Sequence, residues 1–194
     1  MADERTPSVA WRFGVGGGVA AAFLVIDQLT KVAVRGAVAS GWTGPDLLPG
    51  IMRLQFVANT GAAFSFGEGH GLAFVLLAAA VVIGTAVYLA RAPQVSKVEV
   101  IGLAMVAGGA VGNAIDRLAF GYVTDFLATE FIDFPVFNVA DIGITCGVAV
   151  AFIGFLVLSP ANRVDATEEL NRRDAERRAR KGSRPEDGDR KGGR

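Results

Sequence analysis

The sequence has little of the chemistry on which disulfide-rich proteins and zinc proteins depend. It contains one cysteine, Cys146, and one histidine, His70. A single cysteine excludes an internal disulfide framework and a metal site built from several cysteines. Because Cys146 lies inside an apolar run, we expect it to be a small buried side chain.

The single histidine leaves little room for a nucleophile of the Ser–His type. His70 lies in a glycine-rich turn, five residues after Ser65. A Ser65/His70 pair is conceivable, but no neighbouring residue supplies the other parts of a catalytic triad. A solvated loop histidine is the interpretation that the sequence favours.

Charge is also scarce, except at the C-terminus. The first 162 residues hold 8 Lys/Arg and 11 Asp/Glu, whereas residues 163–194 hold 11 and 8. Soluble surfaces normally carry about 25–35% charged residues. With 52% hydrophobic residues, the composition indicates a membrane domain over residues 1–162. Residues 163–194 are predicted to form a charged, disordered cytoplasmic tail, with a solvated helix around residues 167–181.

Long apolar runs predict four membrane-spanning helices, each close to the 20 residues that a bilayer requires. The predicted spans are about 13–34, 71–90, 98–116 and 139–158. The first contains Asp27 and Lys31 at i, i+4, where they can pair, and Lys31 can extend outward from the helix end. A cleaved signal peptide ending at residues 37–39 is the alternative, but Lys31 and Arg35 would interrupt its cleavage region.

Two longer connections separate these spans. In the first, residues 36–70, Met52 to Ala58 alternate between apolar and other residues, which predicts a half-buried strand. Residues 62–66 are expected to form a second short strand or a re-entrant piece. With four spans both termini lie on one side, and the basic residues at the ends and at 91–97 indicate the cytoplasm. Both long connections, including residues 117–137, therefore face outward.

An acidic residue stands at the outward mouth of the fourth span. Asn138 and Asp141 are at i, i+3. Burying an unpaired carboxylate in hydrocarbon costs about 2.5–3.5 kcal/mol, so an acid there is a candidate functional residue. If Asn138 caps the helix, Asp141 lies at its third position, where free N–H groups and the helix dipole favour the carboxylate. A capping pair without chemistry is the alternative.

Other acids near the same face could act with Asp141. They are Asp27, Asp116, Asp125 and Asp133. Asp27 is near Lys31 and Asp116 is followed by Arg117, so both are typical of structural ion pairs. Asp133 is expected in an exposed loop. Asp125 has apolar neighbours and no adjacent cation, which raises a carboxyl pKa. Two acids in unlike environments that share a proton can activate water for peptide hydrolysis, and the pattern favours Asp125 with Asp141.

Small residues recur at helical spacing in the last two spans. Gly108 and Gly112 are four residues apart, as are Gly143 and Gly147. Such pairs allow close helix packing in lipid. We therefore expect the third and fourth spans to approach each other, which would bring the outer end of one near the start of the other.

Five motifs occur in one order along the chain. They are Asp27-Gln28-Leu29-Thr30-Lys31, Asn59-Thr60-Gly61-Ala62-Ala63-Phe64-Ser65, Gly108-Gly109-Ala110-Val111-Gly112-Asn113-Ala114-Ile115-Asp116-Arg117, Val123-Thr124-Asp125-Phe126 and Phe137-Asn138-Val139-Ala140-Asp141. Together, over about residues 12–158, they resemble the bacterial lipoprotein signal peptidases (signal peptidase II). Thr124 and Ile142 depart from the family pattern, in which an aliphatic and a small residue are frequent.

The resemblance implies an integral membrane aspartic peptidase of four transmembrane helices, with a small outward-facing β element and a periplasmic helix or loop over the site. It implies removal of signal peptides from diacylglyceryl-modified prolipoproteins, cleaved immediately before the lipidated cysteine, in the bacterial inner membrane. The matching catalytic residues are Asp125 and Asp141. The matching supporting residues are Asp27, Lys31, Asn59, Gly61, Asn113, Asp116, Arg117, Asn138 and Ala140.

The resemblance implies no metal, cofactor or nucleic-acid partner, and it implies membrane lipids and globomycin-like cyclic peptide inhibitors as ligands. Two other functions remain open on the residues alone. An ion- or proton-coupled carrier also uses intramembrane acids, but would place them through the depth of the membrane. A purely structural membrane subunit would tolerate replacement of all these acids.

Overall fold

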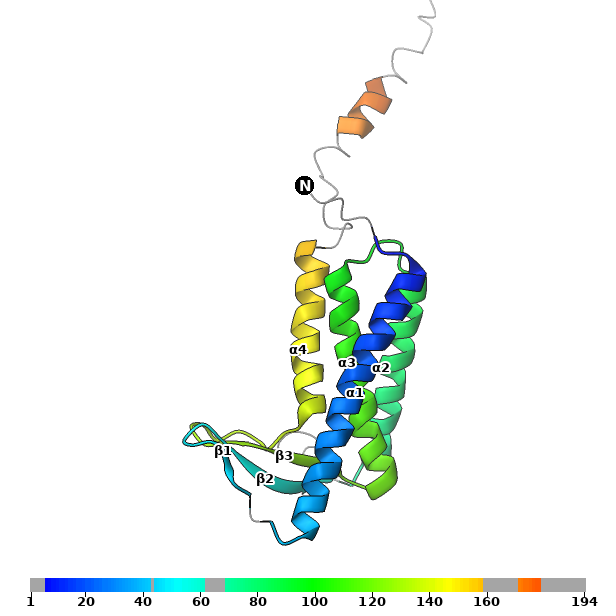
Figure 1. Cartoon of the computed structure of the whole chain (residues 1–194). Coiled ribbons are helices and arrows are strands. Elements are labelled where there is room, and N and C mark those ends of the chain that lie inside the picture. The colour runs from blue at the N-terminus through cyan, green and yellow to red at the C-terminus, as the bar shows by residue number, and fades with distance from the viewer. Residues whose placement is uncertain (1–5, 43, 62–68, 159–170, 179–194) are drawn as a thin grey trace, which may run out of the picture.

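The computed structural model describes residues 6–42, 44–61, 69–158 and 171–178. It consists of a bundle of helices with a small sheet at one end (Figure 1). In chain order the elements are α1 (Val9–Ala39), β1 (Asp46–Leu48), β2 (Met52–Asn59), α2 (Gly71–Arg91), α3 (Lys97–Phe120), β3 (Val123–Thr129) and α4 (Val139–Ile153). A π-helical turn, Gly154–Leu158, continues α4.

Among the described residues, four helices are long and apolar enough to cross a membrane: α1, α2, α3 and Val139–Leu158. Helices are confirmed over all four predicted ranges, although α1 is longer at both ends and α3 continues past the predicted end at 116 to Phe120. We expected the charged Asp116 to end the span at the membrane surface. Asp116 is instead buried within the helix, which continues for another turn. The helix ends instead at Gly121, whose φ of 77° places it in the left-handed region that glycine tolerates.

Side-chain caps fix where three of the helices begin. The Ser8 hydroxyl accepts from the Trp11 N–H at the start of α1. Ser96 forms a reciprocal capping box with Glu99 at the start of α3, and Asn138 forms one with Asp141 at the start of α4. Each cap satisfies backbone N–H groups that have no partner within the helix. The predicted cap by Asn138 is thus confirmed.

Helix α3 occupies the centre of the bundle. In the most apolar 18-residue stretch of α3, 50% of the residues are buried, whereas in that of α2 only 6% are buried. Glycines let α3 and α4 approach closely: a Cβ on Gly147 would lie 2.7 Å from the Gly102 carbonyl oxygen. The expected close packing of the third and fourth spans is therefore confirmed. Gly108, however, lies against Ala20 of α1, so this part of the glycine pattern serves a different helix pair.

At the end of the bundle opposite the sheet, buried polar groups hold the helices together. The Arg12 guanidinium of α1 donates to the carbonyl oxygens of Leu89 (2.9 Å) and Ala92 (2.8 Å) at the end of α2. The Tyr88 hydroxyl hydrogen-bonds to the Glu99 carboxylate of α3. These contacts close the bundle at the side where α1 begins and α4 ends (Figure 1).

The three strands form an antiparallel sheet in the order β1-β2-β3. The predicted strand over residues 52–58 is confirmed as β2, whose Met52, Leu54 and Phe56 pack against a cluster of Val34, Phe126 and Leu127. Asp125 belongs to the connection over residues 117–137, for which no strand was predicted, and it lies on strand β3. This strand is buried on both faces, so its sequence lacks the alternation that marks a half-exposed strand. Residues 62–66, expected to form a further strand, lie outside the described residues.

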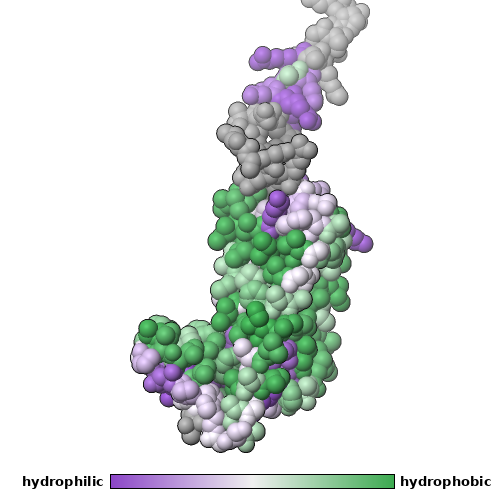
Figure 2. Space-filling view, viewed as in Figure 1, coloured by the Kyte–Doolittle hydropathy of each residue, from purple (hydrophilic) through white to green (hydrophobic). Residues whose placement is uncertain are grey.

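Apolar residues cover most of the visible side of the bundle, and hydrophilic residues gather at its ends and beneath the sheet (Figure 2). Cys146, expected to be buried, is exposed on α4. In a membrane protein, an apolar residue can face lipid instead of a core, so apolarity does not imply burial. Residues 171–178 form an exposed helix, within the expected 167–181 segment. The rest of the predicted tail lies outside the described residues.

Replacing Gly102 should weaken the packing of α3 against α4. A Cβ in Gly102→Ala would lie 2.6 Å from the Gly147 carbonyl oxygen and would also meet the Ala151 backbone nitrogen. We expect destabilisation by about 1–3 kcal/mol, seen as a lower melting temperature in detergent. The control is Gly84→Ala, because nothing lies within 4 Å of that position. Equal melting temperatures for the two variants would contradict this packing.

Candidate active site

A fully buried lysine lies at the sheet end of the bundle. The Lys31 ammonium is 2.9 Å from Asp27 Oδ2 and 3.8 Å from Asp116 Oδ2, and it donates to Asn113 Oδ1 at 2.8 Å. The predicted pairing with Asp27 is confirmed. The predicted outward extension of Lys31 is wrong, because its exposed fraction is 0%. Three acceptors surround the ammonium, which is the condition under which a buried charge is tolerated.

The other oxygen of Asp27 fixes the start of α4. Asp27 Oδ1 accepts the Ala140 N–H at 2.9 Å, which is one of the unpaired N–H groups of the first turn. The carboxylate also occupies the space where a Cβ on Gly112 would lie. Gln28 donates to both Asp27 Oδ2 and the Gly112 carbonyl, each at 3.1 Å. Asp27 thus joins α1, α3 and α4.

Asp116 has a different partner from the one expected. The sequence suggests Arg117, but the structure pairs Asp116 with Arg35 of α1, 3.3 Å away. Asp116 Oδ2 also accepts the backbone N–H of Thr124 at 2.8 Å. The Arg35 guanidinium donates to Thr124 Oγ1 at 2.8 Å and stacks over the Phe120 ring. These contacts attach the beginning of β3, one residue before Asp125, to α1 and α3.

Two buried amides connect the lysine to the candidate acids. The Asn113 oxygen accepts from Lys31 and from Asn138 Nδ2 (3.1 Å), and its nitrogen donates to Asp141 Oδ1 at 2.8 Å. Asn138 Nδ2 donates in addition to Asp125 Oδ1 at 2.7 Å. Both amide orientations are fixed by these partners, since an amide has separate donor and acceptor ends.

Asp141 is held at the N-terminus of α4. Its Oδ2 accepts the Asn138 backbone N–H at 3.1 Å, and its own N–H donates to Asn138 Oδ1 at 3.0 Å. Its other oxygen receives the Asn113 amide. Asn138 therefore contacts both candidate acids, Asp125 through its side-chain nitrogen and Asp141 through its backbone N–H. The two carboxyl groups bracket one asparagine.

Asp125 is almost entirely buried on β3, opposite Val57 of β2. Asn59 Nδ2 donates to its Oδ2 at 2.8 Å. Burial raises the pKa of Asp125 to about 6; the bond from Asn59 opposes this rise, and the charge of Asp141 adds to it. Because the folded pKa is raised, this carboxyl stabilises the fold most below about pH 4 and loses that effect as pH rises through about 6.

Arg117 joins the polypeptide after β2 to the site. Its Nη2 donates to the Gly61 carbonyl at 2.7 Å, and its guanidinium lies 4.8 Å from the centroid of the Phe74 ring. The Gly61 N–H in turn donates to Asn59 Oδ1 at 2.9 Å, which holds the Asn59 amide towards Asp125. The buried Nε of Arg117 has no acceptor among the described residues.

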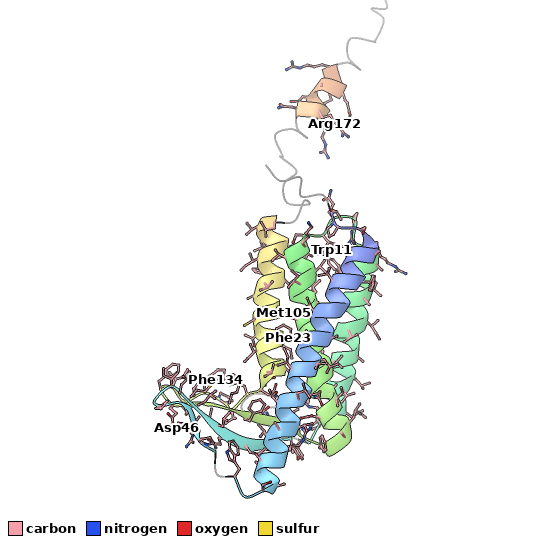
Figure 3. All side chains as sticks on the ribbon, in the orientation of Figure 1. Trp11, Phe23, Asp46, Met105, Phe134 and Arg172 are labelled. Atoms are coloured by element: carbon pink, nitrogen blue, oxygen red, sulfur yellow. The ribbon has the colours of Figure 1, made fainter. Side chains whose placement is uncertain are left out.

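Two cavities meet at Asp125. The first, here called the apolar groove, has a volume of about 550 Å³ and lies between α2, α3 and α4. It is lined by side chains such as Leu77 and Ile144, together with Arg117, Asp125 and Asp141. The second, here called the polar cleft, has a volume of about 520 Å³ and lies beside β2 and β3. Asn59, Asp125 and residues 134–136 border both cavities; Figure 3 shows Phe134 on the sheet side of α4.

The structure thus brings all eleven predicted site residues into one connected set of hydrogen bonds and ion pairs. Sequence reasoning missed Gln28, Arg35 and Thr124. Arg35 had a detectable signal, because it follows Asp27 and Lys31 at successive intervals of four residues and so shares their helix face. Asp133 is exposed, as expected.

A metal site and a Ser65/His70 pair are two further kinds of site, and the structure describes the residues of the second only in part. The described residues contain no group of three or more His, Cys, Asp or Glu side chains placed to hold a metal ion. His70 is exposed at the start of α2. Its possible partner Ser65 lies in a segment that the structure does not describe, so the Ser65/His70 pair stays an expectation.

The chain is similar to known proteins over most of its length. The family model described as Signal peptidase (SPase) II matches residues 19–157. The Lipoprotein signal peptidase of Gloeobacter violaceus is 44% identical over 133 residues, 69% of this chain and 76% of that protein. The Lipoprotein signal peptidase of Symbiobacterium thermophilum is 42% identical over 139 residues, 70% of this chain and 90% of that one.

Solved structures show the same similarity in three dimensions. Two structures of a bacterial membrane enzyme match with TM-scores of 0.66 and 0.65, each at 27% sequence identity. Each alignment covers 74% of this chain, with 88% and 94% of the solved chains respectively.

The environment of Asp125 can be tested by titrating its carboxyl group with ¹³C NMR. We expect a midpoint near pH 6. Asp141→Asn should lower this pKa, because it removes a nearby negative charge, whereas Asn59→Ala should raise it, because it removes a donor to the carboxylate. A midpoint near the ordinary value of about 4 in all three proteins would contradict the described burial.

Proposed function

Because this chain belongs to the signal peptidase II family, we propose that it removes signal peptides from prolipoproteins with Asp125 and Asp141 as its catalytic pair. The substrates are diacylglyceryl-modified prolipoproteins, and the cut falls immediately before the lipidated cysteine. The family makes the protein a multi-pass membrane protease; its assignment as an aspartic endopeptidase is the proposal.

One observation carries the aspartic assignment: the two carboxyl groups bracket Asn138 and line the same groove. Asp125 lies on a strand with a pKa raised to about 6, and Asp141 lies at a helix N-terminus. Acids in such unlike environments can divide the roles of proton acceptor and proton donor. The charge of Asp141 contributes to the raised pKa of Asp125, which places the two groups in electrostatic contact.

The reaction needs one proton shared between the two acids. The ionised carboxylate takes a proton from a water molecule, whose oxygen attacks the carbonyl carbon of the scissile peptide bond. The protonated carboxyl gives its proton to the carbonyl oxygen. When the tetrahedral intermediate collapses, the C–N bond breaks and one hydroxyl of the intermediate returns its proton to the carboxylate that had given it. The departing nitrogen takes the proton that came from water off the other carboxyl group, which leaves a free amino terminus on the cysteine. The polar cleft gives water a path to Asp125.

The apolar groove suits the other parts of the substrate. A signal peptide contains an apolar region of about 7–15 residues, and the diacylglyceryl chains are also apolar. Side chains of α2, α3 and α4 line the groove, and Arg117 lies where it meets the two acids. The unpaired Nε–H of Arg117 provides a donor for a substrate carbonyl oxygen. Globomycin-like cyclic peptides would inhibit by occupying the groove in front of the same acids.

The remaining residues of the network support the pair. Lys31, Asp27 and Ala140 hold the first turn of α4, Asp116 holds the start of β3, and Asn59, Gly61, Asn113 and Asn138 orient the two carboxyl groups. These are positioning roles, because the hydrogen bonds of these residues go to one another and to the two acids.

The network lies at one end of the bundle, and we place this end at the outer face of the inner membrane. The opposite end carries Arg91 and Lys97, and in the sequence it adjoins Arg5 and the basic tail. An excess of Lys/Arg marks the cytoplasmic side. Both termini are then cytoplasmic, residues 1–162 form the peptidase domain, and residues 163–194 form a cytoplasmic tail whose basic residues can contact anionic headgroups.

Replacing either acid should abolish cleavage without unfolding the protein. Asp125→Asn and Asp141→Asn remove the group that accepts or donates the proton, so we expect a loss of at least about 10²-fold in kcat. A gel-shift assay on a diacylglyceryl prolipoprotein measures this, with the melting temperature as the check on folding. The control is Asp46→Asn, an exposed acid on the same sheet.

Three outcomes would count against the proposal. Retained cleavage by either variant would show that its carboxyl group is not part of the reaction. Equal loss of cleavage in Asp46→Asn would show that the assay responds to any change of charge at this end of the protein. Failure of the wild-type protein to cleave the lipidated substrate would overturn the function itself.

A further inference from the structure

We propose that the polar cleft binds the segment of the substrate that follows the lipidated cysteine, and that Arg53 and Asp133 select the charge of that segment. The inference rests on the proposed function, because it concerns the same scissile bond. It assigns a second binding site, for an extended hydrophilic peptide, on the far side of Asp125 from the apolar groove.

The positions of the two cavities lead to this assignment. Asp125 and Asn59 border both, and residues 134–136 lie between them. A peptide bond that is cut at Asp125 therefore has one cavity on each side. The polypeptide on either side of the bond must continue into them, since Asp125 itself is almost completely buried.

The chemistry of the cavities decides which side of the substrate goes where. The apolar groove opens along helices that cross the membrane, so it takes the signal peptide and lipid chains. The polar cleft is lined by charged and polar side chains, including Arg53, Gln55, Thr129 and Asp133. The segment after the lipidated cysteine leaves the membrane for water, and of the two cavities the polar cleft has the lining that suits a hydrophilic segment.

Side chains, rather than strand addition, must read this segment. At Met52 and Arg53, strand β2 pairs with β1 on one edge and with β3 on the other, so its backbone there is not available to a further strand. Arg53 is exposed, and its guanidinium uses one donor on Gln55 Oε1 at 2.7 Å, which leaves further donors for a ligand. Asp133 is exposed and presents the opposite charge.

The register of the sheet places the charged residues along the segment. Asp125 is opposite Val57, four residues from Arg53 on β2, and Arg53 is opposite Ala128, three residues from Asp125 on β3, because the register shifts between Leu54 and Val57. The longer of these two paths sets an upper limit on the separation. At a rise of about 3.3 Å per residue this is about 13 Å. An extended substrate running from Asp125 along β2 therefore reaches Arg53 about three to four residues after the scissile bond. These are the substrate positions at which charge should matter.

The test uses three diacylglyceryl prolipoprotein substrates that share one signal peptide and one lipidated cysteine. They differ only at the third and fourth residues after the cut, which are both Ser, both Glu or both Lys. We would measure kcat/KM for each with the wild-type enzyme and with Arg53→Glu in neutral detergent. Asp133→Lys is the second variant, and Arg91→Glu, an exposed arginine at the opposite end of the bundle, is the control.

Arg53→Glu should lower the ratio of kcat/KM for the Glu substrate to that for the Lys substrate by about 3- to 10-fold. Asp133→Lys should raise the same ratio, and Arg91→Glu should leave it unchanged. Ratios that do not differ among the enzymes, with the Ser substrate still cleaved, would overturn the inference and leave the proposed function intact. The same measurements would be repeated with anionic lipid added to the detergent. If Arg53→Glu slowed all three substrates equally, and only in the presence of this lipid, the cleft would bind lipid headgroups and the inference would be wrong.

Discussion

The burial of the Lys31 ammonium is the constraint on which the arrangement of this end of the protein depends. A cation with no solvent exposure, within a helix that crosses a membrane, is tolerated only when acceptors surround it. Asp27, Asn113 and Asp116 supply those acceptors. Each then makes a second contact: Asp27 with the first turn of α4, Asn113 with Asp141, and Asp116 with the start of β3.

One consequence is that two carboxyl groups from distant parts of the chain are fixed relative to each other. Asp125 comes from a strand and Asp141 from a helix terminus, yet Asn138 donates to both. The strand and the helix are each connected to α1. Arg35 of α1 holds the strand through Asp116, and Asp27 of α1 holds the helix. Loss of one contact in such a network affects several others, because each amide has a definite donor and acceptor end.

The sequence predicted the helical part of the fold well, because membrane spans and helix caps are local signals. The apolar runs identified all four helices, and the spacing of Asn138 and Asp141 identified the cap of α4. Strand β3 was not predicted, since burial on both faces removes the alternation that marks a strand. Cys146 was assigned to a core because sequence alone does not separate a lipid-facing residue from a buried one.

The candidate site shows a similar limit. Local spacing correctly paired Asp27 with Lys31. The pairing of Asp116 with Arg117 was wrong because neighbours in sequence point to different sides of a helix, and a residue of α1 lies closer. Eleven residues of the five motifs were predicted as site residues, and the structure shows what each of them contacts. Their catalytic and positioning roles are proposals that the geometry supports.

The proposed mechanism requires Asp125 and Asp141 to act as one acid–base unit that shares a proton. The decisive measurement is kcat/KM against pH with a diacylglyceryl prolipoprotein, because this profile reports the pKa values of the free enzyme. We expect a bell-shaped profile whose alkaline limb bends near pH 6, where Asp125 loses its proton. Asn59→Ala should move that limb to higher pH, because the carboxylate loses a donor. A flat profile between about pH 4 and 8, unchanged in Asn59→Ala, would contradict the claim.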